Sequence, residues 1–276
     1  MKQKQKDRFS LRLRVIGGHL TAENLRSISK VADEFGSGIV HLTSRQSMEI
    51  PFVSLGDVDP VLKRLAEHGL ETGICGPKVR TITACQGAAI CENGCIDTLS
   101  LAREISARYY GRALPHKFKF GITGCLNNCL KADENDLGIK GGYINDWIKE
   151  TCRDCGLCQK NCRRGAVKAD QGEITIDRLL CNNCGRCVKS CPTGSMSGRS
   201  GYMLVFGGQF GNKVAPGRQL IKILPDVESL FKISDAALDF YSANGQPGER
   251  FGNVIERIGW EKFSQALGGE PLPSAA

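Results

Sequence analysis

The sequence predicts an α+β protein built in three parts, and three observations support this. Short strand and helix patterns alternate in residues 1–72, two runs of four cysteines fall within residues 148–199, and strand and helix patterns resume after residue 200. Regular patterns flank the cysteine runs, so we expect residues 73–147 and 200–276 to form one domain that residues 148–199 interrupt as an insertion. With 41% hydrophobic residues, the 276-residue chain can bury a sizeable core.

The first 72 residues have the order strand, helix, strand, strand, helix. Apolar and basic residues alternate over 9–16, which predicts a half-buried strand. Thr21 is a suitable N-cap for a helix that ends near residue 35. Two short strands over 39–43 and 48–53 follow, and Asp59 then begins a second helix that ends at Gly69. This order predicts a ferredoxin-like α+β module.

A helix and a strand are predicted in the stretch that follows. Asp97 caps a helix that runs to about residue 110. Residues 117–120 read Lys-Phe-Lys-Phe, which on a strand places both lysines on one face and both phenylalanines on the other. The strand leads to cysteines at 125 and 129, so we expect the two ammonium groups to face a metal site. His116 lies beside them, and we interpret it as structural.

After the insertion the sequence predicts a buried strand over 202–206, a glycine-rich loop over 207–211 and a helix over 226–243. The segment 248–263 closes the chain. These elements complete the domain that begins at residue 73.

The insertion holds eight cysteines in two runs, each with spacings of two, two and three residues. The runs are Cys152, Cys155, Cys158, Cys162 and Cys181, Cys184, Cys187, Cys191. This is the pattern of a bacterial ferredoxin with two [4Fe–4S] clusters, in which the fourth cysteine of each run binds the other cluster. One cluster would then use Cys152, Cys155, Cys158 and Cys191, and the second Cys181, Cys184, Cys187 and Cys162. Zinc ribbons use paired cysteines rather than runs of four, so zinc is the weaker alternative.

Four further cysteines form two clusters in the central stretch. Five residues separate Cys85 from Cys91, and three separate Cys125 from Cys129. Thiolates select iron–sulfur, zinc or Cu(I) centres. Zinc sites favour pairs with two to four residues between the ligands, which fits this spacing poorly. The flanking cations Arg80, Lys117 and Lys119 favour a site for an anion beside the metal.

These motifs resemble those of the sirohaem-dependent sulfite and nitrite reductases. That family has a Cys-five-Cys pair and a later Gly-Cys-x-Asn-x-Cys, which stands here as residues 124–129. Residues 41–49 resemble the family's Thr-x-Arg-Gln segment. The tail resembles the end of dissimilatory-type and anaerobic-type sulfite reductase subunits, which carry a ferredoxin domain at this point. The resemblance covers nearly the whole chain.

The resemblance implies two kinds of cofactor, sirohaem and three [4Fe–4S] clusters, of which one is coupled to the sirohaem. Cys85, Cys91, Cys125 and Cys129 would hold the coupled cluster, with Cys129 as the bridge to the sirohaem iron and Asn127 beside it. Lys213 and Arg218 near the glycine loop would bind sirohaem carboxylates. The residues expected to surround the anion are Arg45, Arg80, Lys117 and Lys119.

The implied reaction is the six-electron reduction of sulfite to sulfide. Reduction of nitrite to ammonia on the same fold stays open, as does a non-catalytic subunit that only transfers electrons. A plain ferredoxin is disfavoured, because it would leave two-thirds of the chain and four cysteines without a role. Cys75 and Cys95 are unassigned, and we expect small buried side chains there.

Charge and composition bear on the partners. The net charge is +8, but the positive residues are dispersed and are not interleaved with aromatic residues, which argues against nucleic acid. The insertion has nine Lys/Arg against five Asp/Glu between residues 148 and 198, so we expect an acidic electron-donor protein. The chain has no signal-peptide pattern and no run of about 18 apolar residues, which predicts a cytoplasmic protein without a membrane span. We expect a homodimer or a component of a heteromeric reductase.

Overall fold

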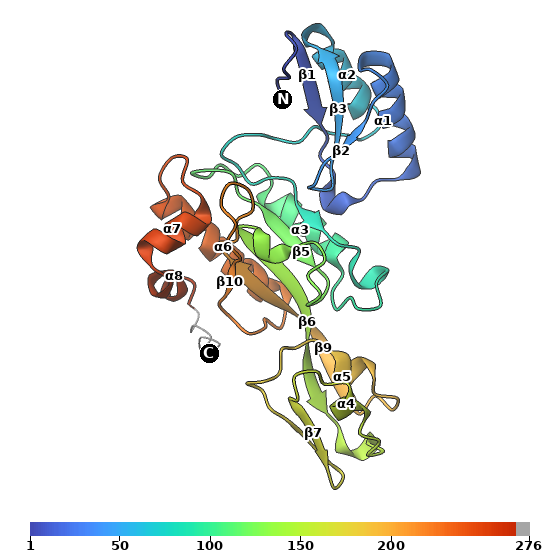
Figure 1. Ribbon diagram of the computed structural model, residues 1–276, viewed down its shortest axis with the longest axis vertical. Coiled ribbons are helices and arrows are strands. Elements are labelled where there is room, and N and C mark those ends of the chain that lie inside the picture. The colour runs from blue at the N-terminus through green and yellow to red at the C-terminus, as the bar shows by residue number, and fades with distance from the viewer. Residues whose placement is uncertain (269–276) are drawn as a thin grey trace.

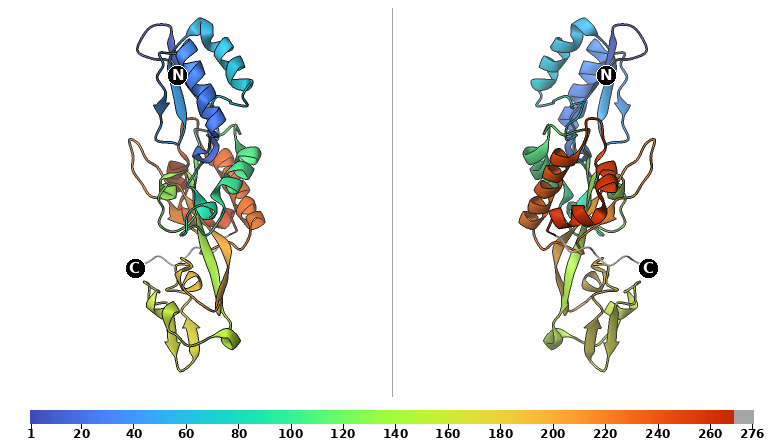
Figure 2. Two further views of the ribbon diagram at one scale, coloured as in Figure 1. Left: turned by 90° about the vertical axis from the view of Figure 1, so that its right-hand side faces the viewer. Right: turned by 90° about the vertical axis from the view of Figure 1, so that its left-hand side faces the viewer.

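The computed structural model describes residues 1–268, which form three successive parts along the long axis of the molecule (Figure 1). The N-terminal part lies at one end, the insertion at the other, and the remaining residues lie between them. The side views show the same order (Figure 2). The predicted range 200–276 ends in residues 269–276, which lie outside the described part. The exact domain boundaries stay a prediction.

The N-terminal part is a small antiparallel sheet packed against two helices. Strands β1 (Arg8–Arg12), β2 (His41–Leu42) and β3 (Met48–Ser54) have the order β1-β3-β2. Helices α1 (Ala22–Phe35) and α2 (Val58–Ala66) complete the predicted element order. Apolar side chains from the sheet and both helices form one hydrophobic cluster, which closes this part as a unit.

The helix ends show one confirmed cap and one error. Thr21 caps α1 as predicted: its Oγ1 accepts a hydrogen bond from Asn24 N at 3.1 Å, and Asn24 Oδ1 accepts one from Thr21 N at 3.1 Å. The expected start of the second helix at Asp59 is wrong. The chain first makes a 3₁₀ turn at Leu55–Asp57, so α2 begins at Val58 and Asp57 takes the N-cap position.

The central part is built on a five-stranded mixed sheet. Its strands are β4 (Thr83–Ala84), β5 (Phe120–Thr123), β6 (Leu137–Trp147), β9 (Met196–Phe206) and β10 (Arg218–Gln219), in the order β10-β9-β6-β5-β4. β4, β5 and β6 are parallel, and β9 is antiparallel to β6. The carboxyl ends of β4 and β5 therefore lie at the same edge of the sheet.

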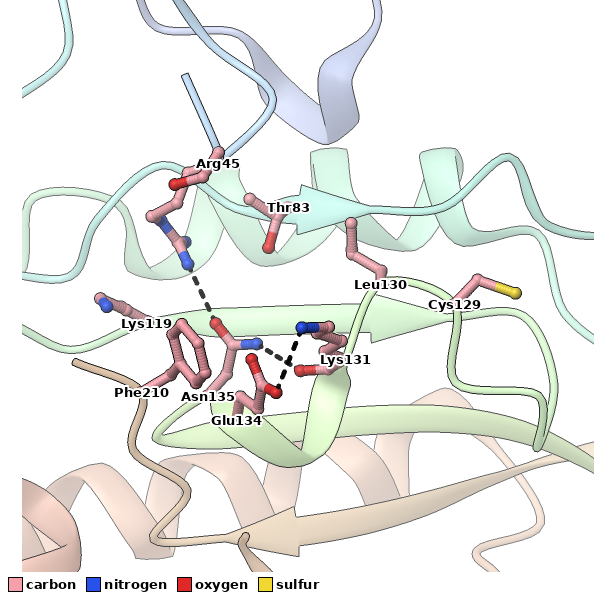
Figure 3. A pocket seen from close by; sticks show the side chains of 10 residues that line it. Arg45, Thr83, Lys119, Cys129, Leu130, Lys131, Glu134, Asn135 and Phe210 are labelled. Carbon is pink, nitrogen blue, oxygen red and sulfur yellow. Dashed lines mark hydrogen bonds and ion pairs between the residues drawn. The ribbon is translucent and has the colours of Figure 1, made fainter. Parts of the chain in front are cut away.

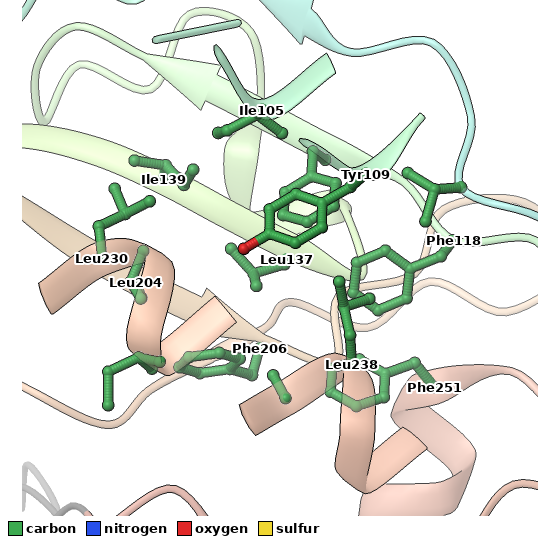
Figure 4. Packing of buried hydrophobic residues seen from close by; sticks show 14 of the residues in the cluster. Ile105, Tyr109, Phe118, Leu137, Ile139, Leu204, Phe206, Leu230, Leu238 and Phe251 are labelled. Atoms are coloured by element: carbon green, nitrogen blue, oxygen red, sulfur yellow. The ribbon is translucent and has the colours of Figure 1, made fainter. Parts of the chain in front are cut away.

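Helices α3 (Thr98–Tyr109), α6 (Val227–Asn244), α7 (Phe251–Ile258) and α8 (Trp260–Ala266) pack on this sheet. Figure 4 shows apolar side chains of α3, α6 and α7 meeting those of the strands in the main hydrophobic core. Aromatic rings dominate it; the Tyr109 and Phe120 rings, for example, are stacked with centroids 5.5 Å apart. None of the helices in the described residues is long and apolar enough to cross a membrane.

The insertion is connected to the central sheet by a long two-stranded antiparallel ribbon. β6 and β9 pair over their full length, from Leu137 opposite Phe206 to Trp147 opposite Met196, and leave the central sheet together (Figure 1). The strand predicted over 202–206 is thus only the end of β9, and β6 was not predicted.

Beyond the ribbon lie α4 (Leu157–Lys160), the antiparallel pair β7 (Val167–Asp170) and β8 (Glu173–Ile176), and α5 (Arg186–Lys189). Five 3₁₀ turns complete the described structure: Ile16–Gly18, Leu55–Asp57, Gly87–Ala89, Ala132–Glu134 and Lys149–Thr151.

Candidate functional site

The two central cysteine pairs meet at the edge where parallel strands end. Cys85 directly follows β4, and Cys125 follows β5 after one glycine. Cys85, Cys91, Cys125 and Cys129 all line one cavity of about 360 Å³. The fold therefore brings the four predicted ligands together, although no three His, Cys, Asp or Glu of residues 1–268 are grouped tightly enough for a single metal ion.

The backbone around this cavity is tightly packed and offers amide donors to sulfur. Gly124 N donates a hydrogen bond to Cys85 Sγ at 3.1 Å. A Cβ on Gly124 would lie 2.9 Å from the Cα of Gly87, and one on Gly94 would lie 2.4 Å from Ala88 N, so the loops approach as only glycine allows. Soft sulfur ligands with amide donors to sulfur fit an iron–sulfur cluster.

The loop that carries Cys129 is held by its neighbour. Asn128 adopts a left-handed backbone conformation, with φ of 54°. Its side chain accepts a hydrogen bond from Ala132 N at 2.8 Å and donates one to Asp133 Oδ2 at 2.9 Å. Cys129 is exposed, whereas Cys85 and Cys125 are half-buried. The Cys129 thiol is thus positioned on a fixed loop with room beside it.

A second cavity, of about 410 Å³, shares Cys129 and Leu130 with the first. Figure 3 shows Arg45, Lys119 and Lys131 around it, with Cys129 at the far side from Lys119. Asn135 holds Arg45: Arg45 Nη1 donates to Asn135 Oδ1 at 3.0 Å, and Arg45 Nη2 donates to Thr81 O at 3.0 Å. A cation-lined cavity therefore adjoins the cysteine cavity.

All four predicted anion-binding residues line a third cavity, of about 250 Å³, which shares Arg45 and Lys119 with the second. Of these three cavities, Arg80 and Lys117 line only the third. The Arg80 guanidinium donates to the carbonyls of Ile74 at 2.7 Å and Gly76 at 2.9 Å, so part of its donor set is already used. Arg12, which sequence reasoning missed, lines the same cavity.

Burial among like charges lowers the pKa values of two cavity residues, Lys119 and Arg45. Burial, followed by the charges of Arg45 and Arg250, lowers the pKa of Lys119 to about 8. Burial lowers the pKa of Arg45 to about 10, so its guanidinium remains charged at neutral pH. Phe118 and Phe120 are fully buried and Lys117 and Lys119 half-buried, which confirms the predicted alternation, although β5 itself begins only at Phe120. Lys119 is therefore a cation that can also release a proton.

An ion pair behind Lys119 was also missed. Asp136 is fully buried and accepts hydrogen bonds from Lys119 N at 2.9 Å and from Arg250 Nη2 at 2.9 and 3.0 Å. Arg250 lies 114 residues further along the chain than Asp136, at the start of α7. Only the fold could reveal this pair, because neither residue falls in a recognisable motif.

Other predicted residues lie elsewhere. Lys213 pairs with Glu256 at 2.6 Å, and the Arg218 guanidinium lies 4.3 Å from the centroid of the Trp260 ring; neither lines the cavities beside Cys129. Asn127 lines the cysteine cavity. Cys95 is buried as expected, but the expectation for Cys75 is wrong, because it is exposed.

In the insertion, Cys152, Cys155, Cys158 and Cys191 line one small cavity of about 20 Å³, so the last cysteine of the second run lies with the first three cysteines of the first run. Cys181 and Cys187 lie near Asn145 of β6, whose Nδ2 donates to Cys187 Sγ at 3.4 Å. Ala166 N donates to Cys162 Sγ at 3.2 Å, and Met196 N to Cys191 Sγ at 3.3 Å. Amide donors thus accompany both predicted ligand sets.

The fold and these cavities define an iron–sulfur protein of mixed α/β fold with a cationic cavity beside its cysteines. Residues 75–275 match the model of the nitrite and sulphite reductase 4Fe-4S domain, and residues 1–68 match the nitrite/sulfite reductase ferredoxin-like half domain. The chain belongs to the nitrite and sulphite reductase family. Membership confirms the resemblance and implies an iron–sulfur cluster and sirohaem.

Relatives span several reductases. The coenzyme F420-dependent sulfite reductase of Methanocaldococcus jannaschii is 36% identical over 91% of this chain, which spans only 40% of that protein. The alpha subunit of the dissimilatory-type sulfite reductase of Allochromatium vinosum is 29% identical over 94% of this chain and 68% of that one. One subunit of the anaerobic sulfite reductase of Salmonella typhimurium is 34% identical over 56% of this chain and 50% of its own length.

Solved structures share the fold. The crystal structure of dissimilatory sulfite reductase I has a TM-score of 0.79 at 20% identity and covers 97% of this chain and 71% of that one. The NirA protein of Mycobacterium tuberculosis has a TM-score of 0.66 at 19% identity and covers 98% of this chain and 42% of that one. The mixed α/β fold is therefore that of the sulfite and nitrite reductases.

Proposed function

We propose that the protein is a sirohaem-dependent reductase that converts sulfite to sulfide in a six-electron reaction. The observation that carries the proposal is that Cys129 lines both the cysteine cavity and the cationic cavity. A cluster ligand at this position would join an electron store to whatever binds beside Arg45 and Lys119. The sulfite reductases among the relatives support the choice of substrate.

The residues present fit both cofactors. Cys85, Cys91, Cys125 and Cys129 would hold a [4Fe–4S] cluster, and the exposed Cys129 would also face the sirohaem. Sirohaem supplies an iron that coordinates the anion and transfers electrons to it. Its carboxylates suit a cavity whose cations include Arg45 and Lys131. Lys213 and Arg218 would reach it only by leaving their present partners.

The cations would bind the anion and supply protons. Arg45 can present parallel donors to an oxyanion, and Asn135 and Thr81 hold it in place. Lys119, with its pKa lowered to about 8, can donate a proton to a departing oxygen and be reprotonated near neutral pH. Arg80 and Lys117 would draw the anion in through the neighbouring cavity.

The insertion would be a ferredoxin domain with two [4Fe–4S] clusters, which gives three clusters in the chain. Its net positive charge suits an acidic electron-donor protein. The rim of the cationic cavity is exposed at Cys129, Lys131 and Phe210, so a second protomer could cover it. We therefore retain the homodimer, or a heteromeric reductase, as the proposed assembly.

Spectroscopy and metal analysis test this function. The purified protein should show sirohaem absorption bands and roughly twelve non-haem irons, as three cubes require. It should also reduce sulfite to sulfide with a reduced viologen dye as the donor. Absence of the sirohaem bands would overturn the proposal. Bands without turnover of sulfite or nitrite would favour the non-catalytic electron-transfer subunit.

Nitrite is the second candidate substrate. The large subunit of the NADH nitrite reductase of Escherichia coli is 34% identical over 49% of this chain, and both anions suit a small cationic cavity. Parallel measurements of kcat/KM for sulfite and nitrite decide between them. We expect the higher value for sulfite, and a higher value for nitrite would reverse the assignment.

A further inference from the structure

The two halves of the insertion repeat each other, but they have different neighbours. Lys160 in the last turn of α4 lies between Cys158 and Cys162, and Lys189 in the last turn of α5 lies between Cys187 and Cys191. Lys160 is exposed, and within residues 1–268 its side chain makes no hydrogen bond. Lys189 instead reaches the central domain. Lys160 stands at the position equivalent to Lys189 but lacks its contacts, so it serves as the comparison for the role of Lys189.

Lys189 holds the loop that carries Cys91. Its Nζ donates hydrogen bonds to the carbonyls of Glu92 at 2.6 Å and Gly94 at 2.9 Å. Nζ also lies 5.8 Å from the centroid of the Tyr143 ring on β6. One ammonium group therefore ties α5 to two carbonyls of the segment between Cys91 and Cys95.

The same loop is fixed from two other directions. Cys95 N donates to Gly124 O at 2.6 Å, next to Cys125, and Ser200 Oγ of β9 donates to Cys95 O at 2.6 Å. Cys95 itself is only 3% exposed and lies outside all three predicted ligand sets. The loop, which is exposed at residues 91–93 and buried at Gly94 and Cys95, thus connects the central cysteine cavity to both the ribbon and α5.

Strand β6 brings the two cysteine regions close together. A Cβ on Gly141 would lie 2.4 Å from Gly124 O, so this residue packs against the central cysteine loop. Two residues further on, Tyr143 N donates to Asn183 O at 2.8 Å, and Asn183 Nδ2 donates to Tyr143 O at 2.9 Å. Two strand residues span about 7 Å. The segment around Cys184 therefore lies next to the loop around Cys125.

The first cysteine set of the insertion, Cys152, Cys155, Cys158 and Cys191, lies further along the ribbon from the central sheet. Cys152 and Cys191 line a cavity with Trp147 and Met196, the last pair of the ribbon. In Figure 1, α5 lies nearer the central sheet than α4 does. The two sets therefore have an order relative to the central cavity.

We propose that Lys189 is a positioning residue that fixes the Cys91–Cys95 loop against the second cysteine set, which consists of Cys162, Cys181, Cys184 and Cys187. Electrons would then enter the insertion at the first set, which consists of Cys152, Cys155, Cys158 and Cys191, and leave it through the second. This inference rests on the proposed function. The second set would hold a cluster that passes one electron to the cluster held by Cys85, Cys91, Cys125 and Cys129, so the former would be oxidised and the latter reduced. The electron would originate from the donor protein, and no bond would form or break.

Hydrogen exchange on the cluster-loaded protein tests the contact without any substrate. In Lys189→Met, the amides of Gly94 and Cys95 should exchange about 10-fold faster, because the loop loses a charged donor to two carbonyls. Lys160→Met is the matched control and should exchange like the wild type. Lys189→Arg, which keeps a charged donor, should restore much of the protection. Wild-type exchange in Lys189→Met would overturn the positioning role.

Electron paramagnetic resonance tests the order of the clusters. In fully reduced Lys189→Met, the spin–spin interaction between the central cluster and its neighbour should weaken. When the variant is mixed rapidly with the donor, the clusters of the insertion should be reduced at the wild-type rate, and the central cluster should be reduced more slowly than in the wild type. Unchanged coupling and unchanged reduction of the central cluster would overturn the route. If Lys189→Met binds less iron, Lys189→Gln, which keeps a neutral donor, carries the test. A wild-type protein that reduces neither anion would overturn the proposed function alone, because the exchange result needs no turnover.

Discussion

Lys119 combines a position in the cationic cavity, at the far side from Cys129, with a lowered pKa. Because that pKa is about 8, the ammonium form dominates below pH 8 and is lost as the pH rises through it. We expect anion turnover to fall over the same range. Lys119→Met should lower kcat about 100-fold, since a cation aimed at developing charge is lost, and should abolish this pH limb. Profiles of kcat against pH check both points.

Lys117→Met is the matched control for Lys119→Met. Lys117 lies two residues before Lys119 and is also half-buried, but of the three cavities it lines only the third. This variant should raise KM for the anion and keep the limb near pH 8. If Lys119→Met retains that limb, the proton donor is another group.

Cys129 is the residue that we propose to link the central cluster to the sirohaem. Cys129→Ser removes the thiolate shared by the two cavities, so the central cluster should lose its coupling to the sirohaem. The insertion clusters should survive, because none of their predicted ligands changes. Electron paramagnetic resonance of the reduced variant distinguishes the signals. An unchanged haem and central-cluster signal would contradict the ligand assignment.

At the scale of elements, the buried pair of Asp136 and Arg250 ties the start of β6 to the start of α7. Asp136→Asn removes the charge but leaves Arg250 buried, with 14% of its side chain exposed. We expect the free energy of unfolding to fall by about 3–5 kcal/mol, as for other broken buried pairs. Chemical denaturation of the protein measures this loss.

The comparison for that experiment is an exposed ion pair. Lys149 pairs with Glu173 on the surface of the insertion. Lys149→Met should leave the denaturation midpoint close to that of the wild type, because surface pairs contribute little. Equal effects of the two substitutions would show that Asp136 has no special structural role.

The elements that could be predicted from the sequence are those whose periodicity reflects a single buried face. The helix capped by Asp97 and the alternating residues 117–120 are of this kind, and both are confirmed. Strand β6 was missed because its glycines hide the alternation: Gly141 packs against Gly124 O, and Gly142 against Asn183 O. A close approach between backbones leaves no apolar pattern to detect.

The residues of the candidate site also fall into those that could be predicted from the sequence and those that could not. Cysteines at fixed spacing and cations in a familiar motif were predictable, and the fold brings them to adjoining cavities. Asn135, Asp136 and Arg250 support that site through contacts between distant segments. Such contacts depend on tertiary packing, so a single sequence contains no local signal for them.

At the scale of the whole molecule, the site is open and its cations are divided. Arg80 and Lys117 line a cavity that Cys129 does not reach, and the rim beside Cys129 is exposed. Because Arg45 and Lys119 line one cavity with Cys129 of the same chain, we expect each protomer of a two-fold pair to complete its own site. Mixed dimers of Lys119→Met and Cys129→Ser should then stay inactive, because each chain lacks one of the two residues.

Purified heterodimers, separated by different affinity tags, provide the measurement. Dimers of each variant alone are the controls and should be inactive. Mixed dimers that regain activity would show instead that the cations of one protomer serve the Cys129 site of its partner.

The β6–β9 ribbon makes the insertion detachable. Trp147 and Met196 face each other across the two strands, and antiparallel strands need only a two-residue turn. Replacing residues 148–195 with Asn-Gly should therefore close the ribbon as an ordinary hairpin and leave the sheet order intact, which circular dichroism and thermal unfolding can check. The tip of the ribbon is thus a position at which one electron-carrying domain can be replaced by another without changing the order of the strands in the central sheet.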